Sequence, residues 1–315
     1  MHYRTLGSTG IEIAPLVFGG NVFGWTCDTR RSHALLDRFV SQGLNCIDTA
    51  DIYSAWAAGN QGGESEAIIG EWLKARGGRD KLVLISKVGM WEKRKGLSAT
   101  NIESALEDSL RRLNTDYIDV YFAHIDDPDT PQEQTLRAFE RLVESGKVRS
   151  IGASNYSAPR LVTALDIAQA SDLPAYQVMQ PLYNLYSRTG FESELARLAE
   201  SAQMGVIVYS ALASGFLTGK YTQLEQIHGT ARERILAKYF NPRGQRILDA
   251  LIEVSRQTGA TSAQIALTWL LKRPAVTAPI VSATSIEQLD EIIATLSIDL
   301  PQRAMETLSR ASAED

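Results

Sequence analysis

Cysteine is scarce in this chain of 315 residues, since only Cys27 and Cys46 occur. Two cysteines at this spacing provide neither a disulfide framework nor a metal site. This scarcity favours a reducing compartment, and the opening residues, MHYRTLGSTG, lack the basic and apolar regions of a signal peptide. We therefore expect a cytoplasmic protein that binds no metal.

Long apolar runs and basic blocks are also missing. No stretch approaches the ~18 apolar residues of a membrane span, and the net charge is −5 without a basic cluster that would suit nucleic acid. The remaining composition, 44% hydrophobic and 22% charged, is typical of a globular protein with a large core. We expect neither nucleic acid nor a membrane as a partner.

Eight short apolar runs, rich in β-branched residues, are spaced along the chain. Such runs indicate strands buried on both faces, as in a parallel sheet. They cover 15–20, 44–50, 82–88, 117–124, 148–154, 176–180, 205–210 and 277–283. The stretches between them have the three-to-four residue period of amphipathic helices, most clearly at 31–42, 101–113, 135–143 and 192–204.

Eight alternating units predict an α/β fold, a (β/α)8 TIM barrel, as a single domain over residues 1–315. The alternative is a doubly wound open sheet, which should carry GxGxxG after its first strand. The segment FGGNVFG does not supply this fingerprint, so the barrel is favoured. We also expect an N-terminal β-hairpin within residues 1–12, a long loop over 211–242 after the seventh strand, and a trailing segment at 300–315.

Reactive side chains fall at the ends of successive predicted strands. Asp48 ends the second strand, with Tyr53 five residues further on, while Lys87 ends the third strand and His124 the fourth. Active sites of such barrels lie at the C-terminal ends of the strands, so these side chains should meet at one rim. A single ionisable residue after a strand means little, but this combination predicts a catalytic group.

The chemistry of these four residues suits a carbonyl group. The free pKa of tyrosine is about 10, and a lysine ammonium beside Tyr53 should lower that pKa. Asp48 would keep Lys87 charged and in place. Hydride attack on a carbonyl puts negative charge on its oxygen, which a hydrogen bond from His124 would stabilise. The group therefore predicts carbonyl reduction or the reverse oxidation.

At these positions the sequence resembles the aldo-keto reductase family. The matching segments are DTADIY (48–53), ISKVG (85–89), FAHIDDPDTP (122–131), GASNY (152–156), QPLYN (180–184) and YSALASGFLTGKY (209–221). The resemblance extends over nearly the whole chain in the same order. It implies that Tyr53 is the general acid, that Lys87 and Asp48 tune it, and that His124 polarises the substrate carbonyl.

The resemblance also implies a nicotinamide cofactor on the barrel rim, NADP(H) with NAD(H) as an alternative. Matching positions would hold the nicotinamide carboxamide (Ser154, Asn155 and Gln180) and stack on its ring (Tyr209). The other expected cofactor contacts are Gly20, Asn21, Asp48, Ser210, Leu212, Ser214, Gly215, Lys220, Arg243, Ser282, Thr284 and Gln288.

The chain departs from the family pattern near the far end of the cofactor. Many members have Gly-x-Arg or Gly-x-Lys at positions 282–284, where this chain has Ser-Ala-Thr, and Asn in place of Ile292. The basic residue usually helps to bind the 2′-phosphate of NADP(H). Hydrogen bonds from Thr284 and Ser285, with charge from Arg243, could replace it, so the cofactor preference stays open.

Aromatic side chains follow the first three predicted strands: Phe23, Trp25, Trp56 and Trp91. Scattered surface aromatics are common, but several at one rim suit the wall of an apolar or sugar-binding pocket. With Tyr53 and His124 they are the expected contacts of an aldehyde, ketone or sugar.

Three functions remain open at this point. The first is NADPH-dependent reduction of aldehydes or ketones, and the second is NAD-dependent oxidation of a sugar or polyol. The third is a cofactor-binding regulatory subunit, because some proteins that resemble this family are associated with ion channels.

Overall fold

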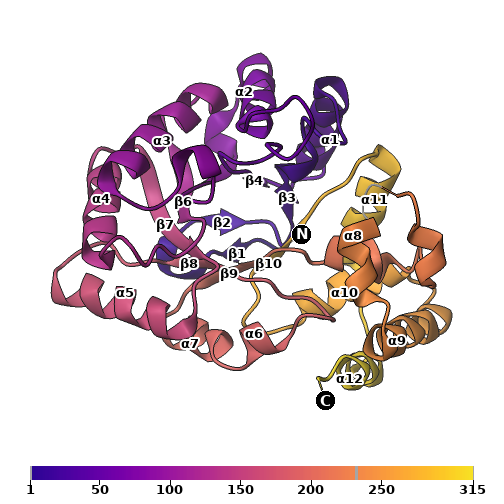
Figure 1. Ribbon diagram of the computed structural model, residues 1–315. Helices are drawn as coiled ribbons and strands as arrows, with labels where there is room; N and C mark the ends of the chain where they lie inside the picture. The colour runs from indigo at the N-terminus through magenta and orange to yellow at the C-terminus, as the bar shows by residue number, and fades with distance from the viewer. Residues whose placement is uncertain (1, 231–232, 315) are drawn as a thin grey trace.

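The structure, a computed structural model, describes residues 2–230 and 233–314. Eight parallel strands close into a barrel in the order β10-β3-β4-β5-β6-β7-β8-β9, with helices around them (Figure 1). The strands are β3 (Val17–Gly19), β4 (Cys46–Asp48), β5 (Val83–Val88), β6 (Ile118–Ala123), β7 (Val148–Ser154), β8 (Val178–Gln180), β9 (Gly205–Val208) and β10 (Ala278–Val281). The predicted (β/α)8 barrel is confirmed, and each predicted strand overlaps an observed one.

The helices begin and end close to most of the predicted limits. They are α1 (Thr29–Ser41), α2 (Glu64–Arg76), α3 (Ala99–Leu113), α4 (Gln132–Glu144), α5 (Ala158–Ala170), α6 (Thr189–Glu192), α7 (Leu195–Ser201), α8 (Glu233–Leu236), α9 (Pro242–Thr258), α10 (Ser262–Leu271), α11 (Ile286–Ala294) and α12 (Gln302–Ala311). Asp28 caps α1 by accepting a 2.8 Å hydrogen bond from the amide of Arg31, which satisfies one of the free N–H groups of the first turn.

The helix predicted over 192–204 is present but shorter than expected. The chain forms α6 and α7 instead, and the backbone leaves the helical conformation at Glu194 (φ −135°). Tertiary contacts fix the residues before this break, since the ring of Phe191 packs 4.7 Å from that of Tyr183 and Glu192 pairs with Arg188. These contacts override the helical period.

The expected N-terminal hairpin is present as β1 (Arg4–Thr5) and β2 (Glu12–Ile13), paired antiparallel. Leu6 and Ile13 are fully buried in the same cluster as Val17 and Cys46, the first residues of β3 and β4. In Figure 1 the two strands cross the centre of the barrel. The hairpin thus closes the N-terminal end of the barrel.

Side chains alternate between the barrel interior and the surrounding helical layer. In β5, Val83 and Ile85 belong to the interior cluster, whereas Leu84 and Val88 belong to the outer cluster. Side chains alternate between the two faces of a strand, so Lys87, two residues after Ile85, also points into the barrel. The predicted site residues at the ends of the other strands lie on the inward face for the same reason.

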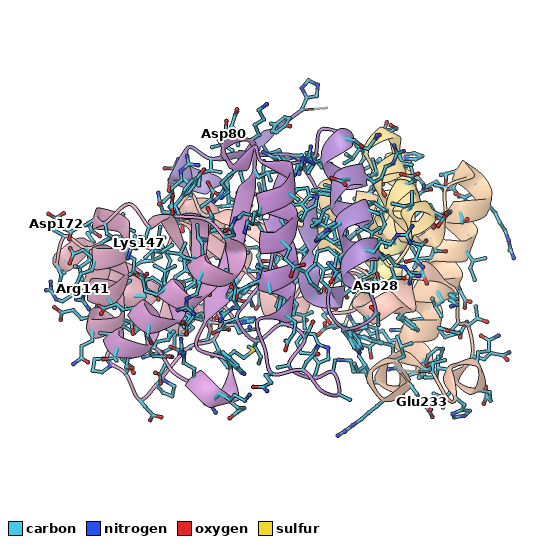
Figure 2. All side chains as sticks on the ribbon, turned by 90° about the horizontal axis from the view of Figure 1, so that it is seen from above. Asp28, Asp80, Arg141, Lys147, Asp172 and Glu233 are labelled. Atoms are coloured by element: carbon cyan, nitrogen blue, oxygen red, sulfur yellow. The ribbon has the colours of Figure 1, made fainter. Side chains whose placement is uncertain are left out.

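The long segment after β9 contains short helical turns at Ala213–Thr218, Leu224–Ile227, α8 and Ala237–Tyr239. The trailing residues form α12, which packs against α9. Charged residues such as Arg141 and Lys147 lie on the outer surface (Figure 2) and pair with Glu103 and Glu107. Across the described ranges, no helix has the length and apolar character needed to cross a membrane.

Candidate active site

The side chains of Asp48, Tyr53 and Lys87 meet at the C-terminal rim of the barrel. The Nζ atom of Lys87 donates to Asp48 Oδ2 at 2.7 Å, to the Tyr53 hydroxyl at 2.9 Å and to the carbonyl of Thr49 at 2.8 Å. The Tyr53 hydroxyl also donates to Asp48 Oδ2 at 3.1 Å. Asp48 and Lys87 have no exposed surface, so the ammonium is fixed by three partners.

His124 lies beside this group. Its ring centre is 6.0 Å from that of Tyr53, and its Nδ1 atom is buried with no hydrogen-bond partner among the described residues. Burial, and then the positive charge of Lys87, hold the pKa of His124 well below its ordinary value. The ring is therefore neutral near pH 7 and has one N–H to offer to an acceptor.

The pKa of Tyr53 corrects one expectation from the sequence. Lys87 does contact the hydroxyl, but burial, and then the charge and hydrogen bond of Asp48, raise the pKa of Tyr53 well above its ordinary value. The Lys87 charge does not dominate, because Asp48 accepts from both partners at one oxygen. Tyr53 thus keeps its proton at neutral pH, as a proton donor must.

Hydrogen bonds connect this group to the residues predicted to hold a nicotinamide. The Gln180 amide donates to Asp48 Oδ1 at 2.8 Å, and the Ser154 hydroxyl donates to the Gln180 carbonyl at 2.9 Å. Asn155 donates to the carbonyl of His124 at 2.9 Å and accepts at 2.8 Å from the Tyr209 hydroxyl. The sequence did not reveal that Gln180 anchors the second oxygen of Asp48.

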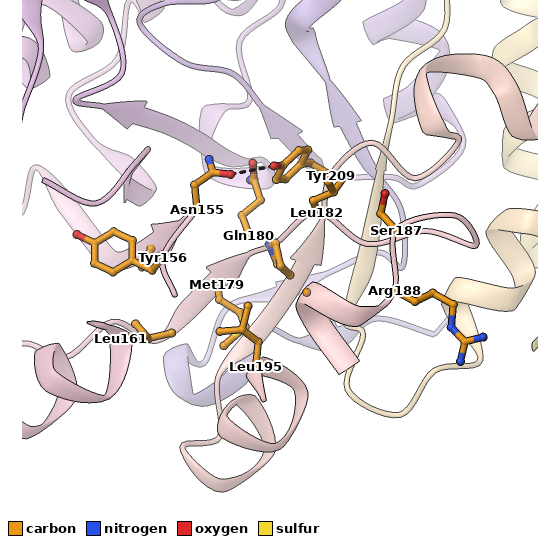
Figure 3. A pocket seen from close by; sticks show the side chains of 13 residues that line it. Asn155, Tyr156, Leu161, Met179, Gln180, Leu182, Ser187, Arg188, Leu195 and Tyr209 are labelled. Atoms are coloured by element: carbon orange, nitrogen blue, oxygen red, sulfur yellow. Dashed lines mark hydrogen bonds between the residues drawn. The ribbon is translucent and has the colours of Figure 1, made fainter. Parts of the chain in front are cut away.

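A cavity of about 190 Å³ adjoins these residues (Figure 3). Asn155, Gln180 and Tyr209 line one side, while Met179 and Leu195 are among the apolar residues that line the other. Amide and hydroxyl groups beside a flat aromatic ring match the chemistry of a carboxamide and its ring. Asp48, Tyr53, Lys87 and His124 are not among the residues that line this cavity, so the fit to a nicotinamide rests on the side chains of Asn155, Gln180 and Tyr209 and not on the cavity itself.

The backbone after β9, where the family resemblance expects the phosphate part of the cofactor, has an unusual conformation, and the amides of Ala213 and Gly215 in it donate to the carbonyls of Ser210 and Leu212. Ser210, Ala213 and Ser214 have φ values of 56°, 48° and 58°, and Gly215 follows at 101°. Left-handed non-glycine residues are strained and cluster at functional sites, and successive N–H groups in such turns bind anions. The predicted contacts Leu212 and Lys220 belong to the same segment, and Lys220 is exposed.

The residues expected near the far end of the cofactor form two small groups. Ser282 donates to Asn21 Oδ1 at 2.7 Å, and Thr284 donates from its amide and hydroxyl to Gln288 Oε1 at 2.9 and 3.0 Å. At Gly20 a Cβ atom would lie 2.8 Å from the Ser65 hydroxyl. A side chain at Gly20 would therefore displace the Ser65 hydroxyl of α2, which donates to the Gly20 carbonyl.

Arg243 holds the C-terminal segment through one nitrogen of its guanidinium. That nitrogen, Nη2, donates to the carbonyls of Tyr186 at 2.6 Å and Ser312 at 3.0 Å and pairs with Glu314 at 3.2 Å. Its Nε atom is buried without a hydrogen-bond partner among the described residues. The expectation that Arg243 also serves a cofactor phosphate stays a prediction.

The predicted aromatic wall is only partly assembled. The ring of Trp56 lies 6.0 Å from Tyr53 and 5.9 Å from Trp25, and it is 49% exposed. Trp91 packs against Gly62. Phe23 is fully buried and stacks at 5.2 Å on Phe18, so its assignment to a substrate pocket is wrong.

Phe23 is buried because a short helical turn at Gly20–Val22 directs the chain back toward the core. That turn has no signal in the hydrophobic pattern. Trp25 and Trp56 are therefore the aromatic residues that the structure joins to the catalytic group.

A closed barrel with Asp48, Tyr53, Lys87 and His124 at its rim, beside a site that fits a nicotinamide, defines a (β/α)8 oxidoreductase scaffold. Comparison with known proteins agrees with this class. The profile of the aldo/keto reductase family matches residues 15–313, and the chain belongs to that family. Its members act on small carbonyl substrates and generally use nicotinamide cofactors.

Similar proteins extend over almost the whole chain. An uncharacterized oxidoreductase, YrpG, of Bacillus subtilis is 34% identical over 98% of this chain and 95% of its own. Protein tas of Escherichia coli is 31% identical over 96% and 95%. A probable voltage-gated potassium channel subunit beta of Oryza sativa is 32% identical over 99% and 96%.

Proposed function

We propose that this protein reduces aldehydes or ketones to alcohols with NADP(H), and that Tyr53 is the general acid. The observation that supports this most directly is the environment of the Tyr53 hydroxyl. It keeps its proton because burial and Asp48 raise its pKa, yet the Lys87 ammonium lies 2.9 Å away. A phenolate formed by proton donation would therefore have a cation beside it at once.

The proposed reaction follows from these groups. The substrate carbonyl oxygen would bind between the Tyr53 hydroxyl and the neutral ring of His124. The Tyr53 O–H would turn from Asp48 Oδ2 to donate to this oxygen, and the N–H of His124 would donate to it as well. A nicotinamide cofactor held at this rim would supply the hydride that the carbonyl carbon receives. As negative charge develops on the oxygen, the Tyr53 proton moves to it, and Lys87 stabilises the phenolate that remains.

The cofactor would lie across the rim. Ser154, Asn155 and Gln180 would bind the carboxamide, and the Tyr209 ring would stack on the nicotinamide. The left-handed segment 210–215, with Lys220, would hold the pyrophosphate. Asn21, Ser282, Thr284 and Gln288 would bind its remaining parts.

A second candidate is oxidation of a sugar or polyol with NAD. It is favoured by the partners of Arg243, which remove one positive charge that could select the 2′-phosphate of NADP(H). The four candidate catalytic residues do not separate the two directions, because the group that donates a proton in reduction accepts it in oxidation.

A steady-state screen tests the proposal. Aldehydes and ketones are offered with NADPH or NADH, and sugars and polyols with the oxidised cofactors. We expect substrate-dependent oxidation of NADPH. Activity only with sugars and NAD would select the second candidate, and cofactor binding without any turnover would favour a regulatory subunit.

A further inference from the structure

Two loops of the barrel rim, the one after β3 and the one after β4, are fastened to each other by side chains. The Ser54 hydroxyl donates to the carbonyl of Phe23 at 2.5 Å. The side-chain amide of Asn60 donates to the carbonyl of Gly24 at 2.7 Å and, within its own loop, to that of Ser54 at 3.1 Å. Ser54 and Asn60 therefore form a clasp between the two loops, and we call this pair the loop clasp.

The backbone at Ser54 is strained. Its φ of 74° is left-handed, a conformation that costs energy for most residues with a side chain. The residue is fully buried and directly follows the proposed general acid, Tyr53, in the sequence. Glycine would adopt this φ without strain, but it has no hydroxyl to donate to Phe23. Strain that accompanies a bond to the neighbouring loop points to a function for that bond.

Each of the two fastened loops carries a tryptophan. Trp25 follows Gly24 directly, and Trp56 lies two residues after Ser54. The two indole rings meet edge to face at 5.9 Å and 89°, and the Trp56 ring lies 6.0 Å from the ring of Tyr53. Because Trp56 is 49% exposed, the pair offers indole surface beside the proposed general acid.

The donors of the loop clasp are used within it. Both N–H groups of the Asn60 side chain have carbonyl acceptors, and the Ser54 hydroxyl donates in the buried interior. These donors are therefore not available to the hydroxyl groups of a sugar. The indole pair that the two loops place beside Tyr53 suits a flat, apolar substituent better than a polyol.

We propose that Ser54 and Asn60 are positioning residues that set substrate selectivity by fixing Trp25 against Trp56. This inference rests on the proposed function and deepens it, because the fixed pair favours aldehydes and ketones whose carbonyl carries a flat, apolar ring. The loop clasp itself does not touch the reacting atoms. Without it, each loop moves with its own tryptophan, and the contact between the indole pair and the substrate ring weakens.

Bonds inside each loop keep its local shape when the loop clasp is removed. In the loop after β3, the amide of Gly24 donates to the carbonyl of Cys27, and the amide of Cys27 donates to that of Val22, both at 2.9 Å. In the loop after β4, the amide of Ala57 donates to the carbonyl of Ser54 at 3.0 Å. A substitution in the loop clasp therefore removes the link between the loops and leaves these bonds in place.

The first test is the selectivity of Asn60→Ala, measured as the ratio of kcat/KM for benzaldehyde to kcat/KM for acetaldehyde with NADPH. We expect this ratio to fall by about two- to tenfold, the range for loss of an aromatic contact. Gln61→Ala is the matched control, because Gln61 is the next residue and its exposed side chain accepts from Lys93 at 3.3 Å. Gln61→Ala should keep the wild-type ratio. An unchanged ratio in Asn60→Ala would overturn the inference.

A double-mutant cycle shows whether Asn60 acts through the indole pair. In a Trp56→Ala background the pair is already incomplete, so adding Asn60→Ala should not change the ratio further. Coupling of this kind is expected for residues that act through one another. Equal effects of Asn60→Ala in both backgrounds would contradict the inference.

Hydrogen exchange tests the loop clasp without any turnover. In Asn60→Ala, the amides of residues 22–27 should exchange faster than in wild type, although the substitution lies in the other loop. Exchange in β6 should not change, and Gln61→Ala should affect neither segment. Wild-type exchange over 22–27, or an equal acceleration in β6 that shows a general loss of stability, would overturn the inference.

Ser54→Gly provides a second variant if Asn60→Ala does not fold. Glycine accepts the φ of 74° and removes only the hydroxyl that donates to Phe23, so the ratio should again fall and residues 22–27 should again exchange faster. Wild-type values of both would overturn the inference.

The failure of the loop clasp and the failure of the proposed function give different results. If Tyr53→Phe is fully active, or if no aldehyde is reduced, the proposed function fails, while hydrogen exchange still reports on the loop clasp. If Tyr53→Phe is inactive and Asn60→Ala matches wild type in both selectivity and exchange, the inference is refuted and the function stands.

Discussion

The Nζ atom of Lys87 lies 2.9 Å from the hydroxyl of Tyr53, although the two residues are 34 positions apart in the sequence. Asp48 and the carbonyl of Thr49 accept the other two N–H groups of this ammonium. The cation is thus directed at the oxygen that would change its charge in the proposed proton transfer. This relationship leads directly to the first two predictions.

Tyr53→Phe should remove most turnover and leave cofactor affinity intact. The phenyl ring preserves the shape but has no proton to donate, and loss of a general acid lowers kcat by about 10²–10⁴-fold. Steady-state kinetics and cofactor fluorescence titration measure the two effects. Tyr3→Phe, in which an exposed hydroxyl loses its bond to the Gly43 carbonyl, should be fully active. Full activity of Tyr53→Phe would refute the mechanism.

Lys87→Met should impair both turnover and stability. It removes the cation beside Tyr53 and leaves Asp48 buried without its charge partner, and breaking such a pair costs about 3–5 kcal/mol. Urea unfolding measures this loss. The double variant Asp48→Asn/Lys87→Met should recover stability without recovering activity. Wild-type kcat in either variant would show that the pair is not used in catalysis.

His124 should act as a neutral donor, so kcat/KM should show no acidic limb from this residue near pH 6.5. Its pKa is lowered in the folded state by burial and then by Lys87. The unfolded chain therefore takes up a proton first on acidification, and this contribution to stability is lost as the pH falls below about 6.5. Unfolding of wild type and His124→Gln across pH 5–8 checks the sign. We expect wild type to lose stability relative to His124→Gln as the pH falls from 8 to 5. A gain of wild type over His124→Gln on acidification would contradict the lowered pKa of His124.

NADPH should quench the protein fluorescence at lower concentrations than NADH. Thr284→Ala should reduce the preference, because it removes a hydroxyl at the position expected for the 2′-phosphate. Arg243→Ala should instead lower stability and leave the ratio of the two affinities unchanged, since its guanidinium binds Tyr186, Ser312 and Glu314. A selective loss of NADPH binding in Arg243→Ala would restore Arg243 to the cofactor site.

Much of the fold was predictable because the barrel strands are buried on both faces. Their apolar runs therefore stand out, and the side chains at their ends follow by parity: Lys87 lies two residues beyond the interior Ile85. Topology then brings Asp48, Lys87 and His124 to one rim, which explains why their proximity could be predicted from chain order.

The errors concern residues whose environment depends on packing between distant segments. Phe23 looks like a rim aromatic until the turn at 20–22 directs it into the core. Arg243 looks like a free cation until the carbonyls of Tyr186 and Ser312 are seen to bind it. The pKa of Tyr53 depends on how the charges of Lys87 and Asp48 balance, which a sequence pattern does not contain.

The N-terminal hairpin has one more consequence. Leu6 and Ile13 pack on the side chains that fill the barrel interior at its N-terminal end. That end is therefore closed twice, by the packed interior and by the hairpin. The loops after β3 to β10 can change in sequence or conformation without opening this core, so the fold separates the part that supplies stability from the part that the proposed function would use.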